Sequence, residues 1–226
     1  MTKLLPAWVE WGAWLLAFNA GGINAVGLLS LEHQALSHVT GSASWLGLEL
    51  ARGNGAQSLH LVLVILAFFL GAVLSGWIIK DGTLKLDRRY GICLLAEAAL
   101  LIAALQSFKA DAETAALWAS AACGTQNAMV STYSGAVIRT THITGTVTDL
   151  GITLGHWLRG LPVEARRVRL HVLVVSGFLV GATGGAAAWL WMRFAALWLP
   201  VAICLGLAVA HTVYQRMARQ HPHGLS

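Results

Sequence analysis

The chain has 226 residues, of which 57% are hydrophobic and 11% are charged, with a mean hydropathy of +0.66 and a formal net charge of +5. A soluble domain carries roughly 25% charged residues, so this composition excludes an ordinary soluble protein and favours an all-α integral membrane protein. Most of the basic residues stand in short segments between apolar runs, which indicates membrane orientation rather than a nucleic-acid partner.

Six apolar runs are long enough to cross the hydrocarbon core as helices, since a span needs about 20 residues. In chain order they cover residues 8–31, 59–79, 90–108, 115–138, 170–191 and 194–214. The first run follows Lys3 as a signal peptide would, but Glu10 interrupts it and it is longer than the apolar part of such a peptide. We therefore predict a retained first span and six full transmembrane helices.

A duplicated motif begins two shorter segments, residues 38–51 and 142–158. Residues 38–47 and 142–151 share five identities and four similar residues, and the one strong mismatch sets Trp45 against Asp149. Outside the motif, Asn24-Ala25 matches Asn127-Ala128 at an offset of 103 (127 − 24), and Gly71-Ala72 matches Gly181-Ala182 at 110 (181 − 71). Such self-similarity predicts a single membrane domain, 1–226, of two repeats, about 6–108 and 113–216. Residues 217–226 are expected to form a disordered cytoplasmic tail.

The short segments decide the topology. At a rise of 1.5 Å per residue, residues 40–51 form a helix of about 18 Å, too short for a bilayer. If both segments return to the side that they entered from, the basic residues divide twelve to three, whereas they divide nine to six if both cross. The twelve are Lys3, Lys80, Lys85, Arg88, Arg89, Arg139, Arg159, Arg166, Arg167, Arg169, Arg216 and Arg219, and the three are Arg52, Lys109 and Arg193.

The positive-inside rule favours the twelve-to-three division, with re-entrant half-helices and both termini in the cytoplasm. Each repeat then has three full spans, an odd number, so the second repeat is inverted relative to the first. Inverted-topology repeats that meet around a central site are typical of secondary transporters.

Both half-helices begin with a sequence suited to anion binding. Thr40 and Thr144 precede a glycine and are expected to cap their helices, leaving backbone N–H groups free for a ligand. We predict that these two N-termini meet near the bilayer midplane and bind a small polar or anionic solute. The expected contacts are Thr40, Gly41, Ser42, Thr144, Gly145 and Thr146. The alternative is that these small residues only allow close helix packing.

Histidines and amides extend this candidate site. His38 and His142 could donate to a substrate or relay a proton, or else hydrogen bond a carbonyl group where a helix is broken. Asn24, Gln126 and Asn127 could line the same cavity, or else join helices by ordinary hydrogen bonds. No zinc-ligand spacing surrounds the histidines, so neither a metal nor a cofactor is expected.

Two acidic residues within the membrane segments are candidates for ion coupling, because an ionisable group there is costly unless it is paired or wet. Asp149 is the first; its alternative role is a structural contact with Arg139, Thr144 or Thr146. Glu97 is the second, with a carboxyl satisfied between helices as its alternative. Cys93, Cys123 and Cys204 are expected to be packing residues, and His221 and His223 to belong to the tail.

These patterns predict a secondary transporter or facilitator rather than an enzyme, with the lipid bilayer and a small solute as partners and no nucleic acid. Self-association into a homo-oligomer stays open. The alternatives are a membrane-embedded enzyme that uses His142 and Asp149, although no nucleophile or metal cluster accompanies them, and an accessory membrane subunit without a substrate.

Four motifs also carry a resemblance to a known family. They are Gly-x-x-Asn-Ala in the first span, His38-Val39-Thr40-Gly41, Gly124-Thr125-Gln126-Asn127-Ala128 and Thr140-Thr141-His142-Ile143-Thr144-Gly145. Together they resemble the YoaK family of bacterial integral membrane proteins over nearly the whole chain. Asn24 and Ser42 depart from this family, which more often has Asp and Asn there. The resemblance implies a multi-pass protein of the bacterial inner membrane and names no activity.

Overall fold

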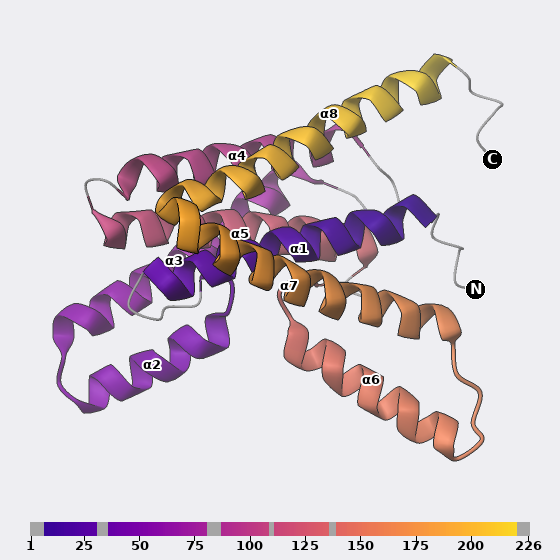
Figure 1. The fold of residues 1–226 in the computed structure, drawn as a ribbon, viewed down its shortest axis with the longest axis horizontal. Coiled ribbons are helices and arrows are strands. Elements are labelled where there is room, and N and C mark those ends of the chain that lie inside the picture. Colours follow the sequence, from indigo (N-terminus) through magenta and orange to yellow (C-terminus); the bar gives the residue numbers. More distant parts are fainter. Residues whose placement is uncertain (1–6, 31–35, 81–86, 109–110, 136–138, 221–226) are drawn as a thin grey trace.

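A computed structural model of the chain describes residues 7–30, 36–80, 87–108, 111–135 and 139–220. These residues are arranged as helices joined by short connections, and no strand occurs among them (Figure 1). The long helices are α1 Ala7–Ser30, α3 Gly55–Ile78, α4 Arg88–Ser107, α5 Ala112–Ser134, α7 Ala165–Met192 and α8 Trp198–Gln220. The short ones are α2 Val39–Ala51, α6 Ile143–Leu158 and the 3-10 turn η1 Arg193–Leu197.

Polar residues mark several helix ends. The side chains of Asn54 and Asp111 accept hydrogen bonds from the first turns of α3 and α5, and Gly135 ends α5 in the left-handed conformation. Hydrogen bonds from Thr114 lower the pKa of Asp111, so this cap is fully formed at neutral pH and weakens only below the usual aspartate pKa of about 3.9. Helix α8 continues to Gln220, so residues 217–220, expected in a disordered tail, are helical. His221 and His223 lie outside the described residues.

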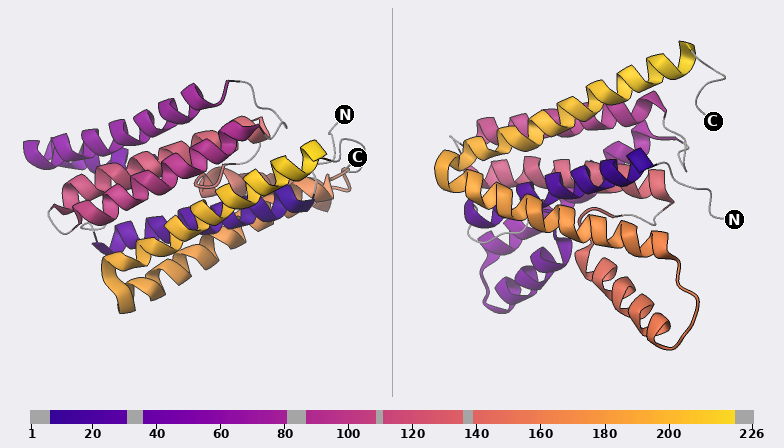
Figure 2. Two further views of the ribbon diagram at one scale, coloured as in Figure 1. Left: turned by 90° about the horizontal axis from the view of Figure 1, so that it is seen from above. Right: turned by 45° about the vertical axis from the view of Figure 1, so that its right-hand side comes forward.

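The long helices form one bundle in which α1 packs most extensively against α7, and α3 against α5 (Figures 1 and 2). Helix α4 packs against both α5 and α8. The short helices project from one side of this bundle, α2 beside α3 and α6 beside α7. Each begins near the middle of the molecule, and they run to opposite ends (Figure 1).

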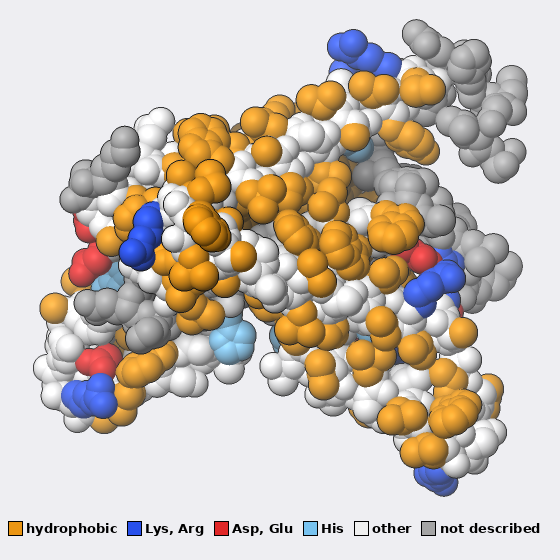
Figure 3. Space-filling view, viewed as in Figure 1, with side chains coloured by type: hydrophobic (Ala, Val, Ile, Leu, Met, Phe, Trp, Pro, Cys, Tyr) orange, Lys and Arg blue, Asp and Glu red, His pale blue; other side chains and the backbone are white. Residues whose placement is uncertain are grey.

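Within the part of the chain that the structure describes, length and composition identify four segments that could cross a membrane, whereas the sequence predicted six. They are Glu10–Ser30, Gly55–Ile78, Arg88–Ser107 and Ala165–Met217, the last of which contains α7, η1 and most of α8. Helix α5 is not among them because amide and hydroxyl side chains occupy its middle, and most of these are buried against other helices. Large apolar side chains cover much of the outer surface, as Figure 3 shows. The molecule is therefore a helical protein of the membrane type.

Glycines set the closest helix contacts. A Cβ atom added at any of four glycines would collide with a backbone carbonyl oxygen of the neighbouring helix. The pairs are Gly21 with Phe178 and Gly181 with Phe18 between α1 and α7, and Gly124 with Phe68 and Gly71 with Ala121 between α3 and α5. The glycines of the two helix pairs are equivalent in the duplicated sequence. Gly21 corresponds to Gly124 at the offset of 103 (124 − 21), and Gly71 to Gly181 at the offset of 110 (181 − 71). Equivalent residues in the two halves thus make equivalent contacts.

Candidate functional site

A cluster of polar side chains lies buried where four long helices meet. The side-chain N–H groups of Asn19 on α1 donate to Oε1 of Glu97 on α4 at 3.0 Å and to Oε1 of Gln126 on α5 at 3.2 Å. Asn19 also lies 3.3 Å from the sulfur of Cys204 on α8. Gln126 in turn donates to the hydroxyl of Thr140 at 3.1 Å. We call Asn19, Glu97, Gln126, Thr140 and Cys204 the central polar cluster.

Every member of this cluster is at most 1% exposed, yet two of its oxygen atoms have no hydrogen-bond partner. They are Oδ1 of Asn19 and Oε2 of Glu97. Buried polar groups are nearly always hydrogen bonded, and an unpaired one costs roughly 1–3 kcal/mol. The cluster therefore has the capacity to accept hydrogen bonds from a further donor.

A cavity of about 560 Å³ lies between the same four helices. Its wall includes one residue on each helix that stands three positions from a cluster residue. The pairs are Leu16 with Asn19, Leu94 with Glu97, Met129 with Gln126 and Leu207 with Cys204. Three residues advance a helix by about 4.5 Å. The central polar cluster thus lies about one helical turn beyond the inner wall of the cavity.

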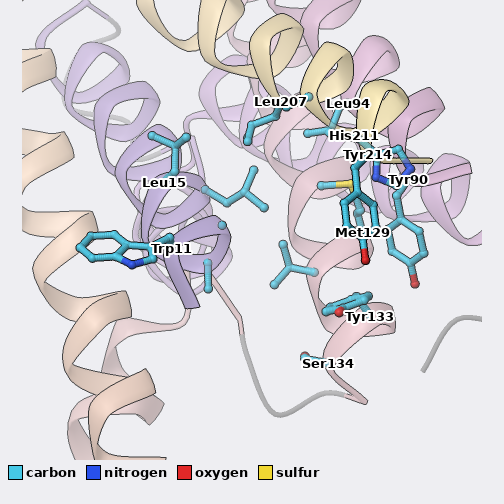
Figure 4. Close-up of a pocket in the computed structure, with 15 residues that line it drawn as sticks. Trp11, Leu15, Tyr90, Leu94, Met129, Tyr133, Ser134, Leu207, His211 and Tyr214 are labelled. Carbon is cyan, nitrogen blue, oxygen red and sulfur yellow. The ribbon is translucent and has the colours of Figure 1, made fainter. Parts of the chain in front are cut away.

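Aromatic side chains line much of the remaining wall of the cavity, together with small and aliphatic residues (Figure 4). Tyr90, Tyr133, Tyr214 and His211 gather on one side, and Trp11 lies across from them. Tyr90 and Tyr133 meet edge to face with 5.5 Å between ring centroids, and the His211 ring nitrogen lies 3.0 Å from the Asp87 carbonyl oxygen. Most of the wall is apolar, and polar atoms occur at only a few places in it. The cavity can therefore hold a largely apolar ligand.

Helices α1 and α8 both line the cavity but touch each other little. In the duplicated sequence α8 is equivalent to α4, and α1 is equivalent to α5. Helix α4 packs closely on α5, whereas the equivalent pair, α8 and α1, makes little contact. The C-terminal part of α8 lies apart from α1 in Figure 1 and in the right-hand view of Figure 2. The two halves therefore differ most in the packing of their last helix.

Histidines, rather than the predicted threonines, occupy the N-cap positions of the two short helices. His38 is the N-cap of α2, where its Nδ1 accepts the backbone N–H of Gly41 at 2.9 Å. His142 takes the same position in α6 without a side-chain cap bond. The prediction of caps at Thr40 and Thr144 was wrong because α2 and α6 begin at Val39 and Ile143, which leaves His38 and His142 as the N-cap residues. Only glycine fits at residue 41, since a Cβ there would lie 2.6 Å from the ring nitrogen of His38.

The predicted residues of this anion site are mostly exposed or already hydrogen bonded. The carbonyl oxygens of Thr40 and Thr144 accept the hydroxyls of Ser44 at 3.0 Å and of Thr148 at 2.9 Å. The Thr146 hydroxyl donates to the carbonyl oxygen of His142, the ring of which packs on Gly145. Ser42 is buried, while His38, Thr40, His142 and Thr144 are exposed.

Asn24 and Asn127 hold the segments that precede the short helices. Oδ1 of Asn24 accepts the Ser37 hydroxyl at 3.0 Å, and Oδ1 of Asn127 accepts the Thr141 hydroxyl at 3.2 Å. The two bonds occupy corresponding positions of the repeats. Of the three predicted amides, only Gln126 belongs to the central polar cluster.

Asp149 and Glu97, the two predicted coupling residues, lie in different surroundings. Asp149 is partly exposed and lies 3.5 Å from Arg167 and 3.8 Å from His171, both on α7, rather than against Arg139, Thr144 or Thr146. Asp149 thus forms an ion pair with Arg167 that joins α6 to α7. Glu97 lies instead within the central polar cluster.

Asn19, Thr140 and Cys204 are the members that the sequence did not predict, and Cys204 was expected only to pack. The repeat did contain a signal for part of the cluster. At the offsets of 103 and 104, Gln126 corresponds to Ile23 and Thr140 to Leu36, and both of these are buried apolar residues. One half thus has an apolar pair where the other has a hydrogen-bonded polar pair.

The fold and the buried polar groups define a class: an all-helical protein of the membrane type with a polar centre between its helices. A family model described as a protein of unknown function, DUF1275, matches residues 12–210, so the chain belongs to this family. No curated protein and no solved structure matches the chain. The name YoaK remains a resemblance of the sequence motifs.

Proposed function

We propose that this protein is a secondary transporter or facilitator of a small solute. The observation that carries the proposal is the cavity of about 560 Å³ that ends one helical turn from a buried, incompletely paired polar cluster. Pockets that bind small molecules are mostly apolar with a few convergent polar groups; the wall of this cavity is mostly apolar, and the central polar cluster lies just beyond it. Ionisable residues buried within membrane segments mark solute and ion pathways.

The proposed architecture has six spans, α1, α3, α4, α5, α7 and α8, with α2 and α6 as re-entrant helices. The matched glycine contacts between α1 and α7 and between α3 and α5 support two inverted repeats. The exposed arginines at the start of α7 lie at one end of the molecule, and Arg52 and Arg193 follow helices that end at the other. By the positive-inside rule the first end, with both termini, faces the cytoplasm of a bacterial inner membrane.

The chemistry of the cavity favours a solute with an apolar body and a group that donates hydrogen bonds. The unpaired oxygens of Asn19 and Glu97 both accept, so an N–H or O–H group suits them better than an anion. An anion would instead suit the N-termini of α2 and α6, which remain a second candidate binding site. The deeper burial and the adjacent cavity make the central polar cluster the better supported of the two.

An enzyme that uses His142 and Asp149 has less support. The Asp149 carboxylate is paired with α7, and the His142 ring packs on Gly145 of its own helix. Neither side chain lines the cavity.

Flux into proteoliposomes tests the transporter proposal. The panel should contain amines, amides, nucleobases and amino acids, together with carboxylates and inorganic anions. Gly12→Trp provides a structural test because Gly12 lines the cavity and a Cβ there meets nothing within 4 Å, so the indole can occupy the cavity without a backbone collision.

We expect Gly12→Trp to abolish the flux. Gly76→Trp is the matched control, since this glycine also has open space around it and lies outside the cavity wall. Absence of flux for every solute with folded protein would overturn the proposal, and so would equal flux in Gly12→Trp and the wild type.

A further inference from the structure

Three glutamates are buried among the described residues, and two of them have a cationic partner. Glu49 has both oxygens occupied, Oε1 by Arg52 at 2.8 Å and Oε2 by Asn54 at 2.8 Å. Glu10 lies 2.8 Å from Arg169 and 3.7 Å from Arg166. Both carboxyl groups thus have the cationic partner and the hydrogen-bond donors that a buried negative charge requires.

Glu97 shows the opposite pattern. It is fully buried, no described Lys, Arg or His forms an ion pair with it, and Oε2 has no partner. The titratable groups near it are thiols. Cys204 from α8 forms a hydrogen bond with its carboxyl group, and Cys93 from its own helix and Cys123 from α5 interact with it electrostatically. From α1 the neutral side-chain amide of Asn19 donates a hydrogen bond to it. Neither α3 nor η1, which also touch α4, places a charged side chain in an ion pair with it.

A chain of hydrogen bonds fixes the orientation of both amides near Glu97. Gln126 points its N–H groups at the carbonyl oxygen of Leu16, at 2.9 Å, and that oxygen can only accept. Oε1 of Gln126 therefore faces Asn19, so Asn19 must present its N–H groups to Gln126 and to Glu97. Oδ1 of Asn19 is consequently left without a donor, beside a carboxyl group that also has a free oxygen.

We propose that Asn19 and Glu97 form a proton-binding site in which a proton on Oε2 of Glu97 completes an amide–carboxylic acid pair with Oδ1 of Asn19. An O–H bond forms on Oε2 of Glu97, and the proton comes from a hydronium ion of the solvent, which leaves as water. This one proton supplies the donor that both unpaired oxygens lack and removes the uncompensated charge. A divalent cation such as Ca²⁺ takes 6–8 oxygen ligands, far more than two free oxygens. The site's role in ion coupling rests on the proposed transport function, whereas proton binding itself does not.

Infrared spectroscopy of the full chain in lipid nanodiscs tests the site, because a protonated carboxyl and a carboxylate absorb at separate positions. We expect a carboxylic acid C=O band at neutral pH that Glu97→Gln removes. The glutamine keeps one carbonyl oxygen and supplies an N–H to Asn19, so this variant should fold as the wild type does. Glu49→Gln is the matched control and should leave the band unchanged, since Arg52 and Asn54 already occupy both oxygens of Glu49.

Two results would overturn the site. One is a band of equal size in the wild type and Glu97→Gln. The other is a thermal stabilisation of the wild type by NaCl over choline chloride that Glu97→Gln abolishes, which would assign the two oxygens to a sodium ion. A reversible loss of the band in the wild type at alkaline pH supports the site even where the variant folds poorly.

The same samples separate this inference from transport. An intact band with no flux for any solute contradicts the transport function and leaves the proton site standing. Flux without the band contradicts the proton site alone.

Discussion

At the scale of single residues, the two cap histidines show how equivalent positions in a duplicated chain can differ. The His38 ring accepts the N–H of Gly41, while the His142 ring lies against Gly145 without a cap bond. A capping hydrogen bond contributes about 0.5–2 kcal/mol to a helix. The two histidines are thus expected to stabilise their helices unequally.

We predict that His38→Ala loosens α2 by about 1 kcal/mol, whereas His142→Ala changes α6 much less. Hydrogen exchange of the first-turn amides of both helices, with the protein in detergent at pH 8, measures the difference. His38→Asn should retain most of the protection because asparagine is a good N-cap. Equal acceleration in both alanine variants would contradict a capping role specific to His38.

At the scale of helices, glycines determine how closely α1 approaches α7 and α3 approaches α5. Each of these glycines faces a backbone carbonyl, which cannot move aside as a flexible side chain can. A methyl group there must push the helices apart, and overpacking of this kind costs typically about 1–3 kcal/mol.

Gly124→Ala should therefore destabilise the protein by about 1–3 kcal/mol, measured by unfolding from mixed micelles. Gly206→Ala is the control, because a Cβ at this helical position of α8 meets nothing within 4 Å. A small gain in stability is expected for the control, since alanine is the better helix former. If Gly124→Ala proved as stable as Gly206→Ala, the contact with Phe68 would not limit the approach of α3 to α5.

Periodicity and composition predicted the helices themselves well, because apolar runs of span length and the duplicated motif are properties of the chain alone. The short helices begin within two residues of Thr40 and Thr144. Membership of the central polar cluster could not be predicted in the same way. Asn19 and Cys204 look like ordinary residues of apolar spans, and only the rotation of α1 and α8 about their axes brings them to Glu97.

At the scale of the whole molecule, the two ends differ in charge, and this difference decides the proposed orientation. The connection from α2 to α3 lies at one end, and the connection from α6 to α7 at the other (Figure 1). Gly55 and Ala165 are the first residues of α3 and α7, and both are exposed. A label at each of them therefore shows on which side of the membrane its end of the molecule lies.

We predict that Gly55→Cys reacts with a membrane-impermeant thiol reagent in intact cells and that Ala165→Cys reacts only after permeabilisation. The three native cysteines are buried and serve as the unlabelled background. If Gly55→Cys stayed unlabelled until permeabilisation, α2 would cross the membrane instead of returning. Labelling of Ala165→Cys in intact cells would place the arginine-rich end outside.

The low hydropathy of α5 bears on how the protein is made. A helix with amides and hydroxyls at its centre partitions poorly into lipid when it leaves the translocon alone. The chain order removes this difficulty, because α3 and α4, which cover α5 in the folded molecule, are synthesised before it. We therefore expect α5 to enter the bilayer as the partner of helices already present, so that biogenesis depends on the same α3–α5 contacts that hold the finished bundle together.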